Sequence, residues 1–135
     1  MAEHQGRRRL TASRLTLAAL MVGAGTSHFV IPASYARIVP SVVGADNARA
    51  VVMVSGAAEI AGGVLLALPR TRRLGAWLTA GLLVAMFPAN VQMALDGGIP
   101  GKGFPLGSPV VAWLRLPLQV PLVWWALVHA RPRQP

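Results

Sequence analysis

Hydrophobic residues in this chain gather in four long runs, which short polar or irregular connections separate. The runs cover residues 15–31, 48–68, 74–95 and 110–130. A helix crosses the hydrocarbon core of a bilayer with about 17 to 25 mainly apolar residues, and each run has a length in this range. Because lipid offers no water to an unpaired backbone group, spanning segments of this kind are helical. The pattern predicts an all-α fold, a four-transmembrane-helix bundle in which residues 14–131 form a single domain.

The composition supports a membrane protein. Hydrophobic residues make up 54% of the 135 residues and charged residues only 13%, whereas soluble domains carry about 25% charged residues. The four runs take up more than half of the chain, which leaves no room for a separate soluble domain. The chain has no cysteine, which excludes disulfides, thiol nucleophiles and cysteine-ligated metal sites.

The net charge of +9 is unevenly distributed. Basic residues precede the first run, fill the turn between the second and third runs and follow the fourth run: Arg7, Arg8, Arg9, Arg14, Arg70, Arg72, Arg73, Arg131 and Arg133. The two other connections hold only Arg37, Arg49 and Lys102. Cytoplasmic loops carry the excess of Lys and Arg. We therefore expect a multi-pass protein with both termini in the cytoplasm, arginines that contact the lipid bilayer, and no nucleic-acid partner.

The start of the chain is polar. Residues 1–13 are expected to form a basic, poorly ordered cytoplasmic tail. The apolar run that follows exceeds the core of a signal peptide, which is about 7 to 15 residues long, so we expect it to be kept as the first span.

The connections carry their own signals. The segment before the second run contains Tyr35 and several aliphatic residues, which predicts a short interfacial helix that Pro40 ends. Residues 96–109 are rich in Gly and Pro and predict an irregular outer loop. Pro88 removes a backbone hydrogen bond inside the third run, so we expect a kink and a carbonyl left free for a neighbouring donor. Trp124 and Trp125 are expected to anchor the fourth run at the membrane interface.

The most informative residue is Glu59, a lone carboxyl group in the middle of the second run. A charged side chain at that depth costs about 2.5 to 3.5 kcal/mol on insertion scales, so it normally faces the protein interior and has a partner. Arg115 lies inside the fourth run and is the obvious partner. Small residues surround Glu59, from Ser55 to Gly63, and would let a neighbouring helix approach closely. We therefore expect an ion pair between Glu59 and Arg115.

Further polar residues fall at similar depths. With a rise of about 1.5 Å per residue, His28, Asn90 and Arg115 lie within about 8 Å of the expected outer boundary. Gln119 and Glu59 lie deeper, at about 13 to 16 Å on the same count. Each run thus places a polar side chain in the outer half of the bundle, while the inner half is almost entirely apolar. These five residues are the candidate site.

Three interpretations of this cluster stay open. It can be a structural network that fixes helix register. It can be a pocket for an amphipathic molecule such as a quinone, an isoprenoid or a lipid headgroup, with Arg115 as the anion contact. It can also serve a proton-linked role, with Glu59 as the titrating group and His28 as a relay. A metal site is not expected, because one His and one Glu fall short of a ligand set.

Several segments resemble the DoxX-like group of small four-helix membrane proteins. The first is Gly25-Thr26-Ser27-His28-Phe29, which leads to Pro32 and Tyr35. The second is the small-residue segment 55–63 with its single Glu59, and segments 69–73 and 87–90 add support. The similarity runs from about residue 15 to residue 128.

The resemblance implies a four-helix bundle in the bacterial inner (plasma) membrane. It also implies an association with quinone-linked oxidoreduction, and Glu59 matches the glutamate in the second helix of that group. With no cofactor motif in 135 residues, we expect an accessory protein without catalytic activity of its own. It would bind a lipophilic molecule or a partner protein through the polar cluster. The alternative is a membrane subunit of a quinone-linked oxidoreductase, with a quinone as the possible cofactor and a membrane or redox protein as the partner.

Overall fold

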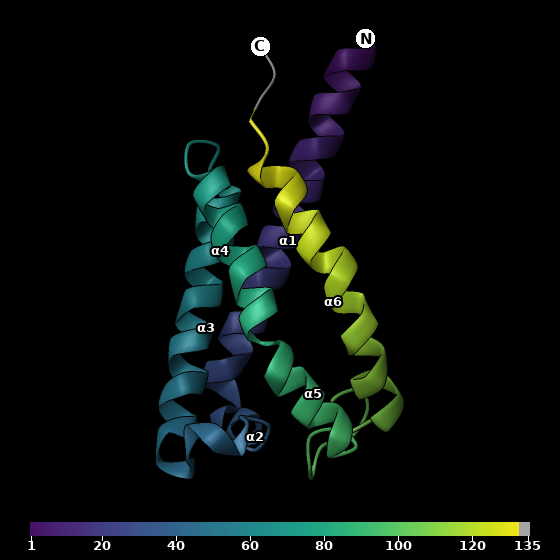
Figure 1. Ribbon diagram of the computed structural model, residues 1–135. Coiled ribbons are helices and arrows are strands. Elements are labelled where there is room, and N and C mark those ends of the chain that lie inside the picture. Colours follow the sequence, from purple (N-terminus) through teal and green to yellow (C-terminus); the bar gives the residue numbers. More distant parts are fainter. Residues whose placement is uncertain (133–135) are drawn as a thin grey trace.

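The computed structural model describes residues 1–132, which form helices and connections without any strand (Figure 1). The expected all-α fold is therefore confirmed. The elements in chain order are α1 (Ala2–Val30), α2 (Pro32–Ala36), the 3-10 helix η1 (Ser41–Val43), α3 (Ala45–Ala67), α4 (Arg72–Ala85), α5 (Phe87–Leu95) and α6 (Pro109–Ala130).

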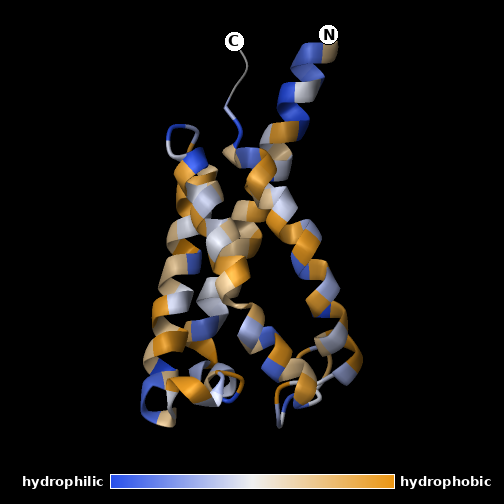
Figure 2. Ribbon diagram, viewed as in Figure 1, coloured by the Kyte–Doolittle hydropathy of each residue, from blue (hydrophilic) through white to orange (hydrophobic). Residues whose placement is uncertain are grey.

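The molecule has two distinct ends. Both the start of α1 and the end of α6 lie at the end that also carries the Arg70–Arg73 turn (Figure 1). We call this the basic end. The opposite end carries α2, η1 and the connection 96–108, and we call it the loop end. Figure 2 shows the most hydrophilic residues gathered at the basic end and in the connections, with mainly apolar helices between them.

Three helical stretches are long and apolar enough to cross a membrane: Ala45–Ala67, Arg72–Leu95 and Pro109–Ala130. The structure is therefore consistent with a membrane protein. The expected fourth span, in α1, is not among these stretches, and its apolar part is confined between Arg14 and His28. The expected third span is two helices, α4 and α5, rather than one. The structure therefore does not confirm the expected four-transmembrane-helix bundle.

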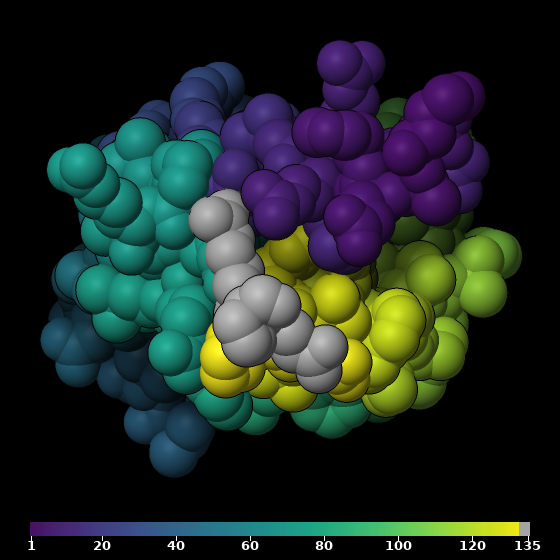
Figure 3. Space-filling model, turned by 90° about the horizontal axis from the view of Figure 1, so that it is seen from above, coloured from purple at the N-terminus to yellow at the C-terminus, as the bar shows by residue number. Residues whose placement is uncertain are grey.

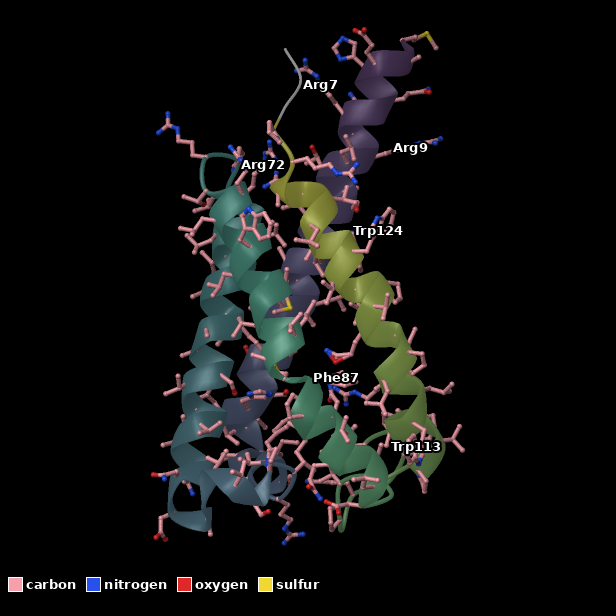
Figure 4. The ribbon with its side chains drawn as sticks, viewed as in Figure 1. Arg7, Arg9, Arg72, Phe87, Trp113 and Trp124 are labelled. Carbon is pink, nitrogen blue, oxygen red and sulfur yellow. The ribbon has the colours of Figure 1, made fainter. Side chains whose placement is uncertain are left out.

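The beginning of α1 also differs from the expectation. Residues 2–13, expected as a poorly ordered tail, are helical and continue without a break into the rest of α1. Their side chains are almost all exposed, and this part of α1 extends beyond the other helices (Figure 4). Arg7 and Arg9 project from it into open space. The helix persists there because extending an existing helix needs no new nucleus.

Glycines bring α1 and α3 into close contact. A methyl group at Gly25 would lie 2.9 Å from the Cβ atom of Glu59, and one at Gly63 would lie 2.8 Å from the carbonyl oxygen of Ala18. Neither position has room for a larger residue. The small residues around Glu59 therefore serve the purpose expected of them, because they let two backbones approach and bury the carboxyl group between them.

The third helical stretch breaks at Met86, two residues before Pro88. Pro88 has no N–H group to donate to the preceding turn, and α5 leaves at an angle to α4 (Figure 1). The carbonyl oxygen of Leu83 accepts a hydrogen bond of 2.6 Å from Nε2 of Gln119 on α6. The expected kink is present. The carbonyl that serves the neighbouring donor is that of Leu83, which the break leaves without Phe87 as its helical donor, and not that of Val84, the carbonyl four residues before Pro88.

Two separate apolar clusters form the interior. The basic-end core joins α1, α3, α4 and α6, and it consists of Leu17, Ala18, Met21, Leu66, Ala76, Ala80, Ala126 and Ala130. The loop-end core joins the loops to α5 and α6, and it consists of Ile38, Met93, Ala94, Ile99 and Ala112. Arg37 strengthens the loop end by donating a 3.1 Å hydrogen bond to the carbonyl oxygen of Pro100. The two connections at this end thus pack together as one cap.

Arginines close the basic end. Arg14 is buried and donates to the carbonyl oxygens of Leu66, at 2.7 Å, and of Ala67, so it caps the last turn of α3. At the end of α6, Arg73 donates a 3.0 Å hydrogen bond to the carbonyl oxygen of Ala130. A guanidinium group at a helix C-terminus satisfies orphan carbonyls and complements the helix dipole. These arginines therefore stabilise the fold itself, which the charge pattern alone did not indicate.

The C-terminal end of α6 is capped and tied to α1 at the basic end. Arg72, which Figure 4 shows beside it, donates to the carbonyl oxygens of His129 and Arg131. Ser13 of α1 links the two helices: its Oγ atom accepts a 2.8 Å hydrogen bond from Nε1 of Trp125 and lies 3.2 Å from Nε2 of His129. Seen from the basic end, α1 adjoins the yellow C-terminal residues of α6 (Figure 3).

Candidate functional site

The five candidate residues lie between the two apolar clusters. On α6, Arg115 and Gln119 are flanked by Ala112 of the loop-end core and Ala126 of the basic-end core. The others belong to α1, α3 and α5. We call His28, Glu59, Asn90, Arg115 and Gln119 together the polar layer. Arg115 is half-buried and the other four are buried.

One part of the polar layer joins α1 to α3 through His28 and Glu59. Nε2 of His28 lies 3.8 Å from Oε1 of Glu59. On its other side, Nδ1 of His28 lies 3.2 Å from the carbonyl oxygen of Val52 and 3.1 Å from Oγ of Ser55. Since a carbonyl only accepts, Nδ1 carries a hydrogen when it bonds to Val52. The second ring nitrogen then faces the carboxyl group at 3.8 Å, beyond hydrogen-bond distance.

The short helix α2 supports this histidine. The ring of Tyr35 packs against the ring of His28 with 4.2 Å between the centroids. The Tyr35 hydroxyl lies 2.8 Å from Oγ of Ser27, next to His28 in the chain. Sequence reasoning placed Tyr35 in an interfacial helix and assigned it no contact. The missed signal is the spacing in Ser27-His28 and Tyr35, which brings α2 back over the end of α1.

A second part of the polar layer joins α4, α5 and α6 through two amides. Nδ2 of Asn90 donates a 2.6 Å hydrogen bond to Oε1 of Gln119. Gln119 in turn donates to the carbonyl oxygen of Leu83, at the break before α5. Each side-chain group of Gln119 therefore has a partner. The amide pair of Asn90 and Gln119 links α5 to α6 and so helps to fix the angle between these helices. Its role is structural.

Arg115 does not form the expected ion pair. Among residues 1–132 the ionisable neighbour of Glu59 is His28, and Arg115 has neither an ion pair nor a hydrogen bond. Around the axis of α6, Arg115 lies between Gln119, which bonds to α4, and exposed Leu118. The physical reason is the packing: α6 packs on α4 and α5 rather than along α1 or α3.

One oxygen of Glu59 is left over. The residue is only 2% exposed, and its Oε2 atom has no hydrogen-bond partner in the described part of the chain. Buried polar atoms are nearly always paired, so an unpaired one calls for an explanation. The polar layer therefore combines a free acceptor on α3, a histidine beside it, and an unpaired cation across from both. That arrangement can hold a polar group that bears both a donor and a negative charge.

Comparison with known families corrects the resemblance stated above. A family model described as a domain of unknown function, DUF8561, matches residues 17–130. This match contradicts the DoxX-like assignment. The segments that suggested it, above all the small residues around Glu59, are what close packing of α1 on α3 requires, and unrelated membrane helices share that requirement. Neither a curated protein nor a solved structure matches the chain.

Proposed function

Since the chain belongs to the DUF8561 family, whose function is unknown, we propose from its own geometry that it is an accessory membrane protein. Its polar layer binds the polar end of an amphipathic molecule from the surrounding bilayer. The unpaired Oε2 atom of Glu59 carries this proposal, because a buried acceptor without a partner destabilises the empty protein and gains a hydrogen bond when a donor arrives.

Arg115 is the second support. An arginine inside a membrane segment without an anionic partner is costly, yet Arg115 is half-buried and lies one turn of α6 from buried Gln119, within the polar layer. A ligand with a donor group and an anionic group would satisfy both residues at once. Both side-chain groups of Gln119 already have partners, in Asn90 and the carbonyl oxygen of Leu83, so Gln119 frames the site rather than binding.

The membrane arrangement is part of the proposal. We place the protein in the inner membrane with α1, α3, the pair α4–α5 and α6 as four spans and both termini in the cytoplasm. The shared basic end supports this orientation. Trp113 and Trp124 support the placement of α6, since both are more than half exposed and point away from the other helices near its two ends (Figure 4). Tryptophans at such positions mark the two membrane interfaces. Trp125, expected beside Trp124, packs inward on Ser13 instead.

The alternatives receive less support. The quinone-linked subunit depended on the DoxX-like resemblance, which the family match overturns. A purely structural network accounts for the amide pair but leaves the free oxygen of Glu59 unexplained. A proton-linked role uses the same histidine and carboxyl group, although it assigns no purpose to the unpaired cation of Arg115.

Native mass spectrometry tests the proposal. The protein, gently extracted from its own membrane, is compared with Glu59→Gln and with the same change at exposed Glu3, Glu3→Gln. We expect a small molecule of defined mass on the wild type and on Glu3→Gln, and a loss of about tenfold on Glu59→Gln, since a hydrogen bond to a charged group contributes about 1.5 to 3 kcal/mol. Bare protein in all three samples, or a bound polypeptide alone, would contradict the proposal.

A further inference from the structure

Both ends of the polar layer are closed. At the basic end, Leu17, Leu66 and Ala126 pack together beneath it, and Ser13 ties α1 to α6. At the loop end, buried Ile38, Met93 and Ile99 hold the two connections together above it. A molecule dissolved in water on either side therefore meets packed side chains before it reaches Glu59.

The side between α1 and α6 is different. The two helices meet at the basic end and do not pack along their length. Figure 1 shows α6 inclined, with its outer end well separated from the end of α1. On α1, Leu17 is 1% exposed, whereas Ala24, one heptad further along the same face, is exposed. On α6, Trp125 bonds to Ser13, whereas Leu118, one heptad back, is 54% exposed.

We call this uncovered strip, with Ala24 on one side and Leu118 on the other, the seam. Arg115 lies one turn of α6 from Leu118 and, around the helix axis, between Leu118 and buried Gln119. Across the seam, His28 stands one turn beyond Ala24. Arg115, which has no hydrogen bond or ion pair within residues 1–132, therefore lies beside a side of the polar layer that neither core covers.

From this arrangement we propose that the molecule bound by the polar layer is an anionic amphiphile that reaches Arg115 sideways from the membrane, through the seam between α1 and α6. This inference rests on the proposed function and names its ligand class and route. Arginine recognises carboxylate and phosphate oxygens through its planar fork of donors. The acyl part of such a molecule stays among apolar residues such as Leu118, where it loses no contact with lipid.

A photoactivatable hydroxy fatty acid and a photoactivatable phosphatidylglycerol, which both carry a hydroxyl donor and an anionic group, distinguish the two sources of the anion. The protein is reconstituted in phosphatidylcholine vesicles that contain one of these probes or the matching fatty alcohol, which has no charge. After illumination, labelled peptides are identified by mass spectrometry. We expect at least one anionic probe to label the peptides that contain Ala24 or Leu118 about tenfold more than the alcohol does.

Two variants assign that labelling to Arg115. Arg115→Gln is expected to reduce it about tenfold, to the level of the alcohol, while Arg115→Lys keeps most of it because the positive charge remains. Arg70→Gln, which removes an exposed arginine from the turn at the basic end, should leave it unchanged. Equal loss in Arg70→Gln would mean that the overall charge attracts the probe, and it would overturn the role of Arg115.

Closing the seam tests the route. In this cysteine-free chain, the double variant Ala24→Cys/Leu118→Cys is joined with a cleavable bis-maleimide. The link should abolish labelling of the polar layer, and cleavage should restore it. If the link has no effect, or if native mass spectrometry retains a ligand that never labels the seam, the route is wrong and binding itself stands. If no probe labels the protein and no ligand is retained, both proposals fail.

Discussion

The basic end and the polar layer use charge in opposite ways. At the basic end, Arg14, Arg72 and Arg73 each donate to carbonyl oxygens at the end of a helix. In the polar layer, Arg115 has no such bond within residues 1–132, and Glu59 keeps an oxygen without a partner in the same range. Charges that are fully paired hold a fold together, whereas charges held apart at a cost are typical of a site that awaits a partner. The comparison separates the structural arginines of this protein from the one we assign to function.

Removing a paired arginine should have the largest effect on stability. Arg14→Ala leaves the carbonyl oxygens of Leu66 and Ala67 without their donor and empties a buried position. We expect a loss of about 3 kcal/mol in the free energy of unfolding in detergent, the sum of two charge-assisted hydrogen bonds at the lower end of their range. Thermal unfolding followed by circular dichroism measures it.

The matched control is Arg9→Ala, because Arg9 is exposed on the protruding start of α1 (Figure 4). Its melting temperature should equal that of the wild type. If Arg9→Ala and Arg14→Ala lower the melting temperature equally, the basic end depends on its total charge and the capping role of Arg14 is wrong.

An intermediate effect is expected at the amide pair. Gln119→Leu removes the acceptor of Asn90 and the donor to Leu83, which should cost about 1.5 kcal/mol, as for one neutral hydrogen bond and one unpaired carbonyl. Gln92→Leu is the control, since Gln92 bonds only to Asp96 within its own exposed turn. A large loss in Gln92→Leu with none in Gln119→Leu would show that α5 is not held by the pair.

The sequence predicted which residues belong to the basic end and the polar layer better than it predicted which residues they contact. The three helical stretches that are long and apolar enough to span a membrane follow from hydrophobic runs, and the break near Pro88 follows from a missing N–H group. The five polar residues were expected at similar depths. The partner of Glu59 did not follow, because it depends on how far α6 tilts away from α1 and α3, and no local pattern encodes that angle. The capping role of Arg14 did not follow from the sequence either. An arginine at this position fits the excess of basic residues on the cytoplasmic side whether its side chain contacts lipid or the end of α3.

The break between α4 and α5 shows that local backbone chemistry can be predicted from the sequence, whereas the packing of distant helices cannot. Pro88 alone predicts that the carbonyl of Val84, four residues earlier, loses its donor, since the proline ring nitrogen cannot donate. The carbonyl that Gln119 bonds is that of Leu83, and this partner depends on the packing of α6 against α4. In the same way, the glycines of α1 and α3 predict a close contact but not that His28 becomes the neighbour of Glu59.

The smallest effect should come from the coupling between the two unpaired charges. In a double-mutant cycle of Glu59→Gln and Arg115→Gln, the coupling energy should fall below about 0.6 kcal/mol, the mean for polar contacts between membrane helices, because no bond joins the two residues. The cycle of Glu59→Gln with His28→Asn should reach or exceed that value, since these two side chains are adjacent. Both are measured by thermal unfolding in detergent.

A coupling of several kcal/mol between Glu59 and Arg115 would mean that the seam closes in solution and that the two charges pair directly. The polar layer would then be a satisfied structural network like the basic end, and the distinction between the two regions would disappear.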